Sequence, residues 1–491
     1  MPVLFNTIPQ TMRSPLFYAE MDNSKAGTFS ASYRALLIGQ VLSTATIELN
    51  KAVYISSLAH AKSKCGAGSQ LAQMVEAYLN NNTSVEFYVL PIADPASGAA
   101  ASGSIAVTGS ASASGTVSLY VYDTAVQVGV AEGDSASTVA SSIVTAINGN
   151  ADLPVTASAN EATVTLTAKH KGVIGNDTII ALNLGGDANG EATPAGLTIT
   201  INAMSGGSGN ADISDAIANI GEEQYDFVVS GFTVSSILKA LSAYMNDKTG
   251  NWSYSKQLYG HVWAAFRGTV AECQTFGAGY NDQHLSVMGI SGTHSPIWSV
   301  AAALAGSAAT SIAADPARPL QTLSLQGISA PEVASRFILS ERETLLKKGI
   351  STYTVNAGTV QIDRVITTYQ TNAYGQADNS YLSVETLYQS AYILRYLRRI
   401  ITSKYGRHKL AKDGTRFGEG QAIATPNTLR AELIAAYEAL AYQGIVEDVD
   451  AFKENLIVEI NENDKNRVDV LFTPDYVNQL NIFALVNQFR L

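Results

Sequence analysis

The sequence of 491 residues is poor in charge, in cysteine and in basic tracts. Charged residues make up 15 % of it, against about 25 % in an ordinary globular chain. A surface with little charge favours association with other protein surfaces. Its two cysteines, Cys65 and Cys273, are too few and too far apart for a disulfide framework or a cysteine-based zinc site. We therefore predict reduced thiols and a role in protein–protein contacts.

The charge balance and the hydrophobic pattern exclude two further classes of partner. The net charge is -11 and no long Lys/Arg tract opposes it, so the chain repels nucleic acid phosphates. Residues 1–20 lack a basic segment followed by an apolar run, which predicts no signal peptide. The apolar window 297–314 consists largely of Ala and Ser, which argues against membrane insertion. We expect a protein made in the cytoplasm that stays soluble until it is assembled or exported.

No catalytic constellation is recognisable. His261 and Ser286 are present, but no serine lies in a Gly-x-Ser-x-Gly setting. The glycine-rich run 206–209 precedes a predicted helix, yet no Lys-Ser/Thr pair follows it as a phosphate-binding loop requires. The 6 histidines are scattered without metal-ligand spacing. We expect no enzyme, no cofactor and no metal.

The order of predicted elements indicates an α/β fold. An apolar run at 33–40, a helical pattern at 68–80 and an alternating run at 84–90 predict a β-α-β unit. Such units form parallel sheets covered by helices. Strand and helix patterns alternate again from residue 211 to about 309. Residues 31–94 and 211–330 are therefore predicted to form one discontinuous α/β core domain.

The segment 95–210 differs sharply in composition from what flanks it. It is rich in Gly, Ala, Ser and Thr, and its basic residues are Lys169 and Lys171. Six strand-like runs and one helix, beginning near Ser135, fit this segment. We predict an inserted β-rich domain at the surface, because insertions are tolerated at loop tips. A flexible Gly/Ser linker is the alternative.

Residues 331–491 are predicted to form an α+β C-terminal domain. A helix is expected over 332–348, a hairpin across Asn356-Ala357-Gly358, and long helices over 381–404 and 428–442. Strands are expected at 456–460 and 467–472. A last apolar strand, 480–489, has no partner following it.

Both ends of the chain are predicted to be arms that lie on another surface. Residues 1–30 are polar and interrupted by prolines, and show short extended alternation without a helix period. A strand whose edge is unpaired is satisfied by joining a neighbour's sheet. The candidate arm residues are Phe17, Tyr18, Leu480, Ile482, Phe483 and Val486.

A basic segment stands out in this acidic chain, along the end of the predicted helix 381–404 and the loop after it. One interpretation is a solvated helix end, which the helix dipole favours. The other is a surface for an acidic protein partner. The candidates that we assign to this surface are Arg395, Arg398, Arg399, Lys404, Arg407 and Lys409.

Several stretches resemble the tail sheath proteins of Mu-like contractile phages, and the resemblance runs from about residue 10 to the end. It is dense after residue 315, and in the segment 96–210 it is one of character more than of individual residues. The stretches that carry it are 33–39 (YRALLIG), 315–323 (DPARPLQTL), 363–372 (DRVITTYQTN), 378–382 (DNSYL), 404–410 (KYGRHKL), 413–418 (DGTRFG) and 420–426 (GQAIATP).

The resemblance implies a structural role. It implies a central domain of subtilisin-like topology without the protease triad, and subunits that stack as hexameric rings around a rigid tube. It implies that terminal arms of neighbours complete a sheet in the C-terminal domain and hold the rings together during contraction. The implied partners are further copies of the chain, the tail tube protein, and baseplate and tail terminator proteins. The implied location is the virion tail, assembled in the host cytoplasm. Our own hypothesis is that the basic segment faces the tube.

Two alternatives remain open from the sequence. One is a sheath-like subunit of another contractile machine, such as a pyocin or an injection particle. The other is a secreted β-rich adhesin or glycan-binding module, which the composition of 95–210 suggests. The second predicts a signal peptide and a stable monomer.

Overall fold

A parallel sheet forms the centre of the molecule. The computed structural model describes residue 14 and residues 32–82, 84–418 and 420–490. The central strand β1, Arg34–Gln40, is buried at six of its seven positions and pairs with β3 on one side and β11 on the other. The other strands of the sheet are β2 (Val53–Tyr54), β3 (Glu86–Ile92), β11 (Phe227–Ser230), β12 (His261–Arg267) and β13 (Leu285–Ile290).

The strand order is β13-β12-β11-β1-β3-β2, with β2 antiparallel at the edge. Taken along the chain, the five parallel strands have the order 2-1-3-4-5 of open doubly wound sheets. Residues 95–210 leave this sheet after β3 and return before β11. The subtilisin-like topology implied by the resemblance stays a prediction.

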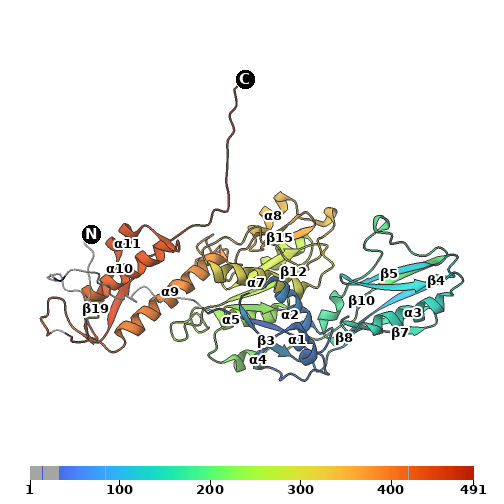
Figure 1. Cartoon of the computed structure of the whole chain (residues 1–491), viewed down its shortest axis with the longest axis horizontal. Coiled ribbons are helices and arrows are strands. Elements are labelled where there is room, and N and C mark those ends of the chain that lie inside the picture. The colour runs from blue at the N-terminus through green and yellow to red at the C-terminus, as the bar shows by residue number, and fades with distance from the viewer. Residues whose placement is uncertain (1–13, 15–31, 83, 419, 491) are drawn as a thin grey trace.

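Helices cover both faces of the sheet (Figure 1). The connections from β1 to β3 and from β11 to β12 run in opposite directions along the sheet, so right-handed crossovers place their helices on opposite faces. Helix α2 packs against β1 and α7, and α7 also packs against β11 and β12. The helices are α1 (Leu58–Cys65), α2 (Gln70–Asn81), α4 (Ser214–Ile220), α5 (Ser235–Met245), α6 (Val270–Gly277) and α7 (Ile297–Ala314).

Helix α7 is long and apolar enough to cross a membrane by length and composition. In the structure 72 % of it is buried, and it packs against α2 and the central strands β11 and β12. It is therefore the core helix of this domain.

The segment 95–210 folds as two antiparallel sheets with one helix. The sheets have the orders β10-β4-β8-β7 and β6-β5-β9. Ser135 caps the helix by accepting a hydrogen bond from Thr138 N. Strand β7 was not predicted, because only the first of its small, mostly polar residues is buried. The elements are β4 (Ala100–Gly109), β5 (Gly115–Val121), β6 (Thr124–Val130), α3 (Ala136–Gly149), β7 (Val155–Asn160), β8 (Thr163–Lys171), η1 (Val173–Asp177), β9 (Ile180–Leu182), η2 (Asp187–Asn189) and β10 (Leu197–Ser205).

The helix predicted over 332–348 is shorter than expected. A 3-10 turn, η3, covers Val333–Ser335, and helix α8 begins only at Leu339 and ends at Leu346. The Glu341 carboxylate accepts a hydrogen bond from Ile338 N and so fixes this later start. The predicted hairpin forms between β14, Thr352–Asn356, and β15, Thr359–Arg364. Its turn residues Ala357 and Gly358 have φ of 47° and 80°, as a type I′ turn requires.

The C-terminal part has its own hydrophobic core, formed by Ile393, Leu433, Tyr437, Phe452 and their neighbours. Residues of α8, of the β14–β15 hairpin and of the first turns of the next helix belong instead to the central core. The predicted boundary at residue 331 therefore does not coincide with the boundary between the two cores. The elements are α9 (Val384–Tyr405), β16 (Lys409–Leu410), β17 (Ile423–Ala424), α10 (Pro426–Tyr442), β18 (Val446–Glu447), α11 (Val449–Asn455), β19 (Ile457–Ile460), β20 (Val468–Leu471) and β21 (Asp475–Tyr476).

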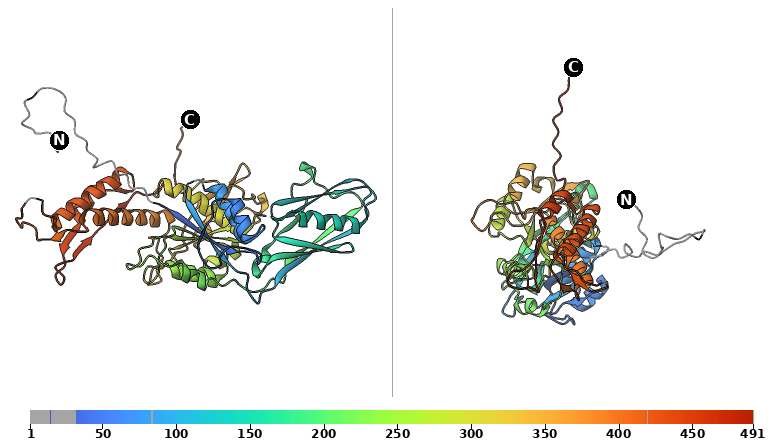
Figure 2. Two further views of the ribbon diagram at one scale, coloured as in Figure 1. Left: turned by 60° about the horizontal axis from the view of Figure 1, so that its bottom comes forward. Right: turned by 90° about the vertical axis from the view of Figure 1, so that its left-hand side faces the viewer.

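The three parts lie in a row along the long axis of the molecule. Figure 1 shows the inserted sheets at one end, the central sheet in the middle, and α10, α11 and β19 at the other end. Helix α9 bridges the central and C-terminal parts, and Figure 2 shows this in a second orientation.

Candidate assembly surfaces

His261 and Ser286 meet in the core, but their hydrogen bonds exclude a nucleophilic serine. Ser286 Oγ donates to Ile366 O over 2.8 Å, so it accepts from His261 Nε2, which lies 2.8 Å away. The histidine therefore donates to the serine and is not its base. His261 Nδ1 is buried without a hydrogen-bond partner, so no carboxylate orients the ring. Among the described residues, no group of three His, Cys, Asp or Glu is placed to hold a metal ion.

Burial of His261 predicts a loss of stability in acid. Burial, assisted by nearby His284, holds the pKa of His261 well below its usual value. Below pH of about 6.5 the unfolded chain binds a proton that the folded chain does not. The free energy of unfolding should then fall by up to about 1.4 kcal/mol per pH unit from this group. Denaturant titrations between pH 7.5 and 5.5 should show a shallower decline for His261→Gln, and equal declines would contradict this assignment.

The C-terminal segment leaves the body of the molecule after β21 (Figure 1). Residues 477–490 contain neither helix nor strand, so the predicted strand 480–489 does not form within the single chain. We call residues 481–490 the C-terminal arm. The large apolar residues of the arm, and Leu480 directly before it, are 70–82 % exposed. They are Leu480, Ile482, Phe483, Leu485, Val486 and Phe489. The other arm candidates, Phe17 and Tyr18, lie outside the described residues.

Among the described residues, no third strand pairs with either edge of the hairpin β19–β20. Its two strands form a sheet of their own, with register pairs from Ile457↔Leu471 to Ile460↔Val468. The hairpin packs against helix α10, and a two-stranded hairpin without such packing is only marginally stable in water. Ile457, Val470 and Leu471 are 45–55 % exposed. Beside the open end of this hairpin lies a groove of about 570 Å³, lined by Phe452 and Pro474 among others. The hairpin therefore has both apolar surface and backbone groups available to an added strand.

Most of the basic segment is at the surface. Arg398, Arg399, Arg407 and Lys409 are exposed at the end of α9 and in the loop that follows. Lys404 is also exposed, and its Nζ lies 2.5 Å from Glu432 Oε1 in α10. These exposed basic side chains form what we call the exposed basic surface.

Arg395 differs from the rest of the segment. Its side chain is 15 % exposed and forms an ion pair with Asp226, whose side chain is 1 % exposed. Arg395 also donates to Tyr259 O over 2.9 Å, and its guanidinium lies 5.5 Å from the centre of the Tyr33 ring. Arg395 therefore joins α9 to the central sheet, and we leave it out of the exposed basic surface.

Comparison with known proteins decides the family. Family models for tail sheath proteins match three segments: the beta-sandwich domain at residues 96–198, the central domain at 206–368 and the C-terminal domain at 376–490. The Mu-like prophage FluMu tail sheath protein of Haemophilus influenzae is 41 % identical over 494 residues, covering all of both chains. This chain belongs to the phage tail sheath family.

Solved structures of distant sheath proteins cover nearly the whole chain. The sheath tail protein of Desulfitobacterium hafniense is 12 % identical, covers 95 % of this chain and 97 % of its own, and has a TM-score of 0.49. The helical sheath of the anti-feeding prophage in the contracted state is 10 % identical, with 98 % and 99 % coverage and a TM-score of 0.47.

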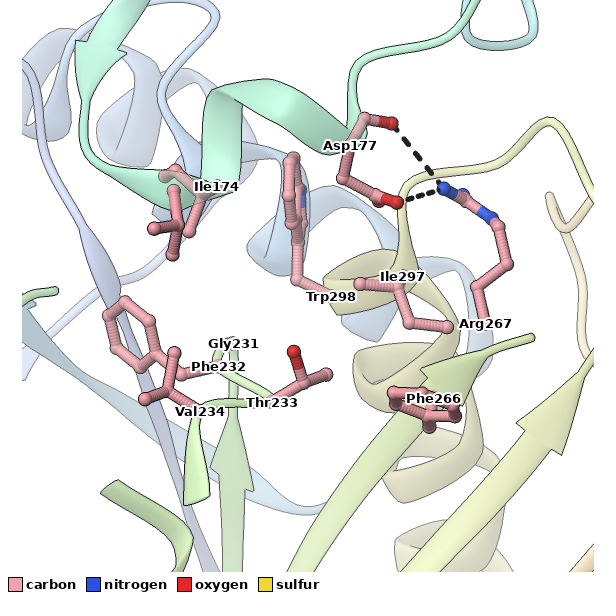
Figure 3. A pocket seen from close by; sticks show the side chains of 11 residues that line it. Ile174, Asp177, Gly231, Phe232, Thr233, Val234, Phe266, Arg267, Ile297 and Trp298 are labelled. Atoms are coloured by element: carbon pink, nitrogen blue, oxygen red, sulfur yellow. Dashed lines mark hydrogen bonds and ion pairs between the residues drawn. The ribbon is translucent and has the colours of Figure 1, made fainter. Parts of the chain in front are cut away.

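A small pocket lies between the beta-sandwich of this sheath protein and the central sheet, and residues of both line it (Figure 3). The pocket, about 160 Å³, lies beyond the carboxyl ends of β11 and β12, where open α/β sheets place ligands. Here η1 of the sandwich covers that position. Ile174 and Asp177 face Phe232, Trp298 and Arg267 across it, and Asp177 Oδ1 lies 2.5 Å from Arg267 Nη1.

Two further contacts hold the sandwich in place. His170 Nε2 accepts from Gln70 N over 3.0 Å, so its Nδ1 donates to Asp94 Oδ1 over 2.7 Å. Asp123 Oδ2 accepts from Ser295 Oγ over 2.6 Å and from Ser329 Oγ over 3.1 Å. Side-chain contacts, and not only its two linkers, therefore attach the sandwich of the sheath protein.

Sequence reasoning missed Asp226, the buried partner of Arg395. The only signal was an acidic residue directly before an apolar strand. The structure does not bring the predicted arm residues at 480–486 onto the β19–β20 hairpin of the same chain, since the arm points away from the body in both views (Figure 2).

Proposed function

We propose that this chain is the subunit of a contractile phage tail sheath. Copies polymerise as stacked hexameric rings around the tail tube, and re-packing of their domains shortens the sheath and drives the tube through the host envelope. The partners are copies of the same chain, the tube protein, and baseplate and terminator proteins. The protein works in the virion tail after assembly in the host cytoplasm. It has no enzymatic step and needs no cofactor.

The observation that carries the proposal is the exposed apolar arm of a sheath-family chain, together with a hairpin whose edges pair with no further strand of the described residues. An arm from one copy is suited to add a strand to the β19–β20 hairpin of the next. Burying one large apolar side chain contributes about 1.5–3 kcal/mol, and ordering one residue costs about 1–2 kcal/mol of backbone entropy. Because roughly half of the arm residues are large and apolar, the free energy gained by burying their side chains only balances the entropy lost in ordering the arm. Backbone hydrogen bonds to a sheet edge supply the remaining stabilisation, which favours strand addition over side-chain docking alone.

Such a link suits a contracting assembly. Main-chain bonds to an edge do not depend on a particular side-chain packing, so domains rotate while the strands stay joined. Negative-stain electron microscopy of the purified chain at high concentration, with and without the tube protein, tests the proposal. Tubes or striated sheaths are expected. A monodisperse monomer in both samples would rule the sheath role out.

The exposed basic surface is proposed to face the tube in the extended state. Replacing Arg398 and Arg399 by glutamate should raise the tube-protein concentration needed for co-assembly about tenfold at low salt. The effect should shrink as salt screens the charges. The matched control is Lys347→Glu with Lys348→Glu, which makes the same charge change on exposed residues after α8. If both variants co-assemble like the wild type, the basic segment is a solvated helix end.

A further inference from the structure

The chain leading to the arm is held firmly up to its last contact with the body. Strand β21 pairs with β18, with Val446 opposite Tyr476. Asp475 N donates to Tyr437 Oη over 3.0 Å, and Val477 N donates to Ile445 O over 3.2 Å. We call residues 475–480 the arm root.

One buried amide in α9 organises this root. Gln389 is 1 % exposed. Its Nε2 donates to Val477 O over 3.0 Å and to Ile445 O over 3.4 Å. Its Oε1 accepts from Gln479 Nε2 over 3.1 Å. Because the Gln389 amide is buried, replacing it by an apolar side chain would remove these three hydrogen bonds from the arm root at once.

Two more glutamines extend the contact to the end of the root. Gln479 Nε2 also donates to Ala317 O over 3.4 Å. Gln321 Nε2 donates to Leu480 O over 3.0 Å. Side chains therefore hold the carbonyls on both sides of Gln479, and the backbone direction at Leu480 is set.

Beyond this point the contacts stop. Asn481 N donates to Gln479 O over 2.9 Å, and residues 482–490 make no hydrogen bond to the described body of the chain. The arm thus starts from a fixed position and direction, while its own side chains remain exposed for contact with a second copy of the chain. A fixed start restricts the volume that the arm samples and raises its effective concentration at one neighbouring site.

We propose that Gln389 is a positioning residue for assembly, which aims the C-terminal arm at the acceptor edge of a second copy. The inference rests on the proposed function, because it requires that the arm bind a neighbour. Gln389 itself touches no neighbour in this scheme. It acts through Val477 and Gln479.

The test compares Gln389→Leu and Gln479→Ala with a matched control, Gln70→Leu. Gln70 is also 1 % exposed and also donates to a backbone carbonyl, Gly231 O, over 2.6 Å, but it lies in α2, in the central domain. Sedimentation with the tube protein measures the critical concentration for polymerisation. A dye on Asn481→Cys reports the mobility of the arm, since Cys65 and Cys273 are buried.

Gln389→Leu and Gln479→Ala should raise the critical concentration at least tenfold and increase dye mobility, whereas Gln70→Leu changes neither at a similar loss of thermal stability. Wild-type critical concentrations in the Gln389 and Gln479 variants would overturn the inference. Gln479 is partly exposed, so its variant tests the idea even if Gln389→Leu does not fold. If a chain without residues 481–491 also polymerises normally, the arm mechanism itself fails, and not merely the role of Gln389.

Discussion

Replacing Arg395 by methionine is expected to lower the free energy of unfolding of the unpolymerised chain by about 3–5 kcal/mol. The substitution keeps the packing volume but leaves the buried Asp226 carboxylate without its cation. The remaining donors are Arg34 N at 2.8 Å and Gln224 Nε2 at 3.1 Å, and neither is charged. Chemical denaturation followed by circular dichroism measures the effect.

The control lies three residues further along the same helix. Arg398 is exposed, so Arg398→Met should change stability by less than about 0.5 kcal/mol. Adding Asp226→Asn to Arg395→Met should recover part of the loss, because it removes the uncompensated charge. Similar small losses for both single arginine variants would show that the ion pair does not stabilise the joint between α9 and the sheet.

Deleting residues 481–491 should abolish sheath polymerisation while leaving the fold intact. The described residues 482–490 make no hydrogen bond to the body, so the melting temperature should stay within about 1–2 °C of the wild type. If the arm adds a strand to a second copy, as we propose, its loss should raise the critical concentration at least a hundredfold, equivalent to about 2.8 kcal/mol per contact. Sedimentation and electron microscopy measure both effects.

A length-matched arm of Gly and Ser separates the arm's chemistry from its mere presence. It keeps the root through Leu480 but removes the apolar side chains, and it should behave like the deletion. Deleting residues 1–20, which include Phe17 and Tyr18, tests the N-terminal arm in the same assay. Regular tubes from the chain without 481–491 would exclude the C-terminal arm as the link.

Local signals predicted most of the elements, and long-range contacts account for what the sequence did not reveal. Asn356-Ala357-Gly358 marked its hairpin because Gly tolerates positive φ, and Ser135 marked a helix start because its hydroxyl caps the first turn. Strand β7 was missed because its residues are held mainly by backbone pairing with β8, while only the first of its side chains is buried.

The candidate sites also divide into those that a local sequence pattern reveals and those that depend on long-range contacts. The sequence marked 480–489 as an apolar segment with no partner strand after it, and the structure leaves its large apolar side chains exposed. The inward turn of Arg395 was not, because its partner Asp226 is 169 residues distant. Gln389 carries no signal either, since a glutamine in a helix is ordinary until the carbonyls that it holds are known.

Helix α9 connects the two hydrophobic cores of the molecule. Its 22 residues span roughly 33 Å, with one end seated in the central core and the other in the C-terminal core. Arg395 contacts the Tyr33 ring and pairs with Asp226, which also accepts from Arg34 N at the start of β1. Gln389, six residues earlier on the same helix, contacts the arm root. A rotation of α9 would therefore act on the start of β1 and on the arm root together. A tilt of 10° would displace its far end by roughly 6 Å over that length, so a small rotation of α9 in the central core becomes a larger displacement at the C-terminal core.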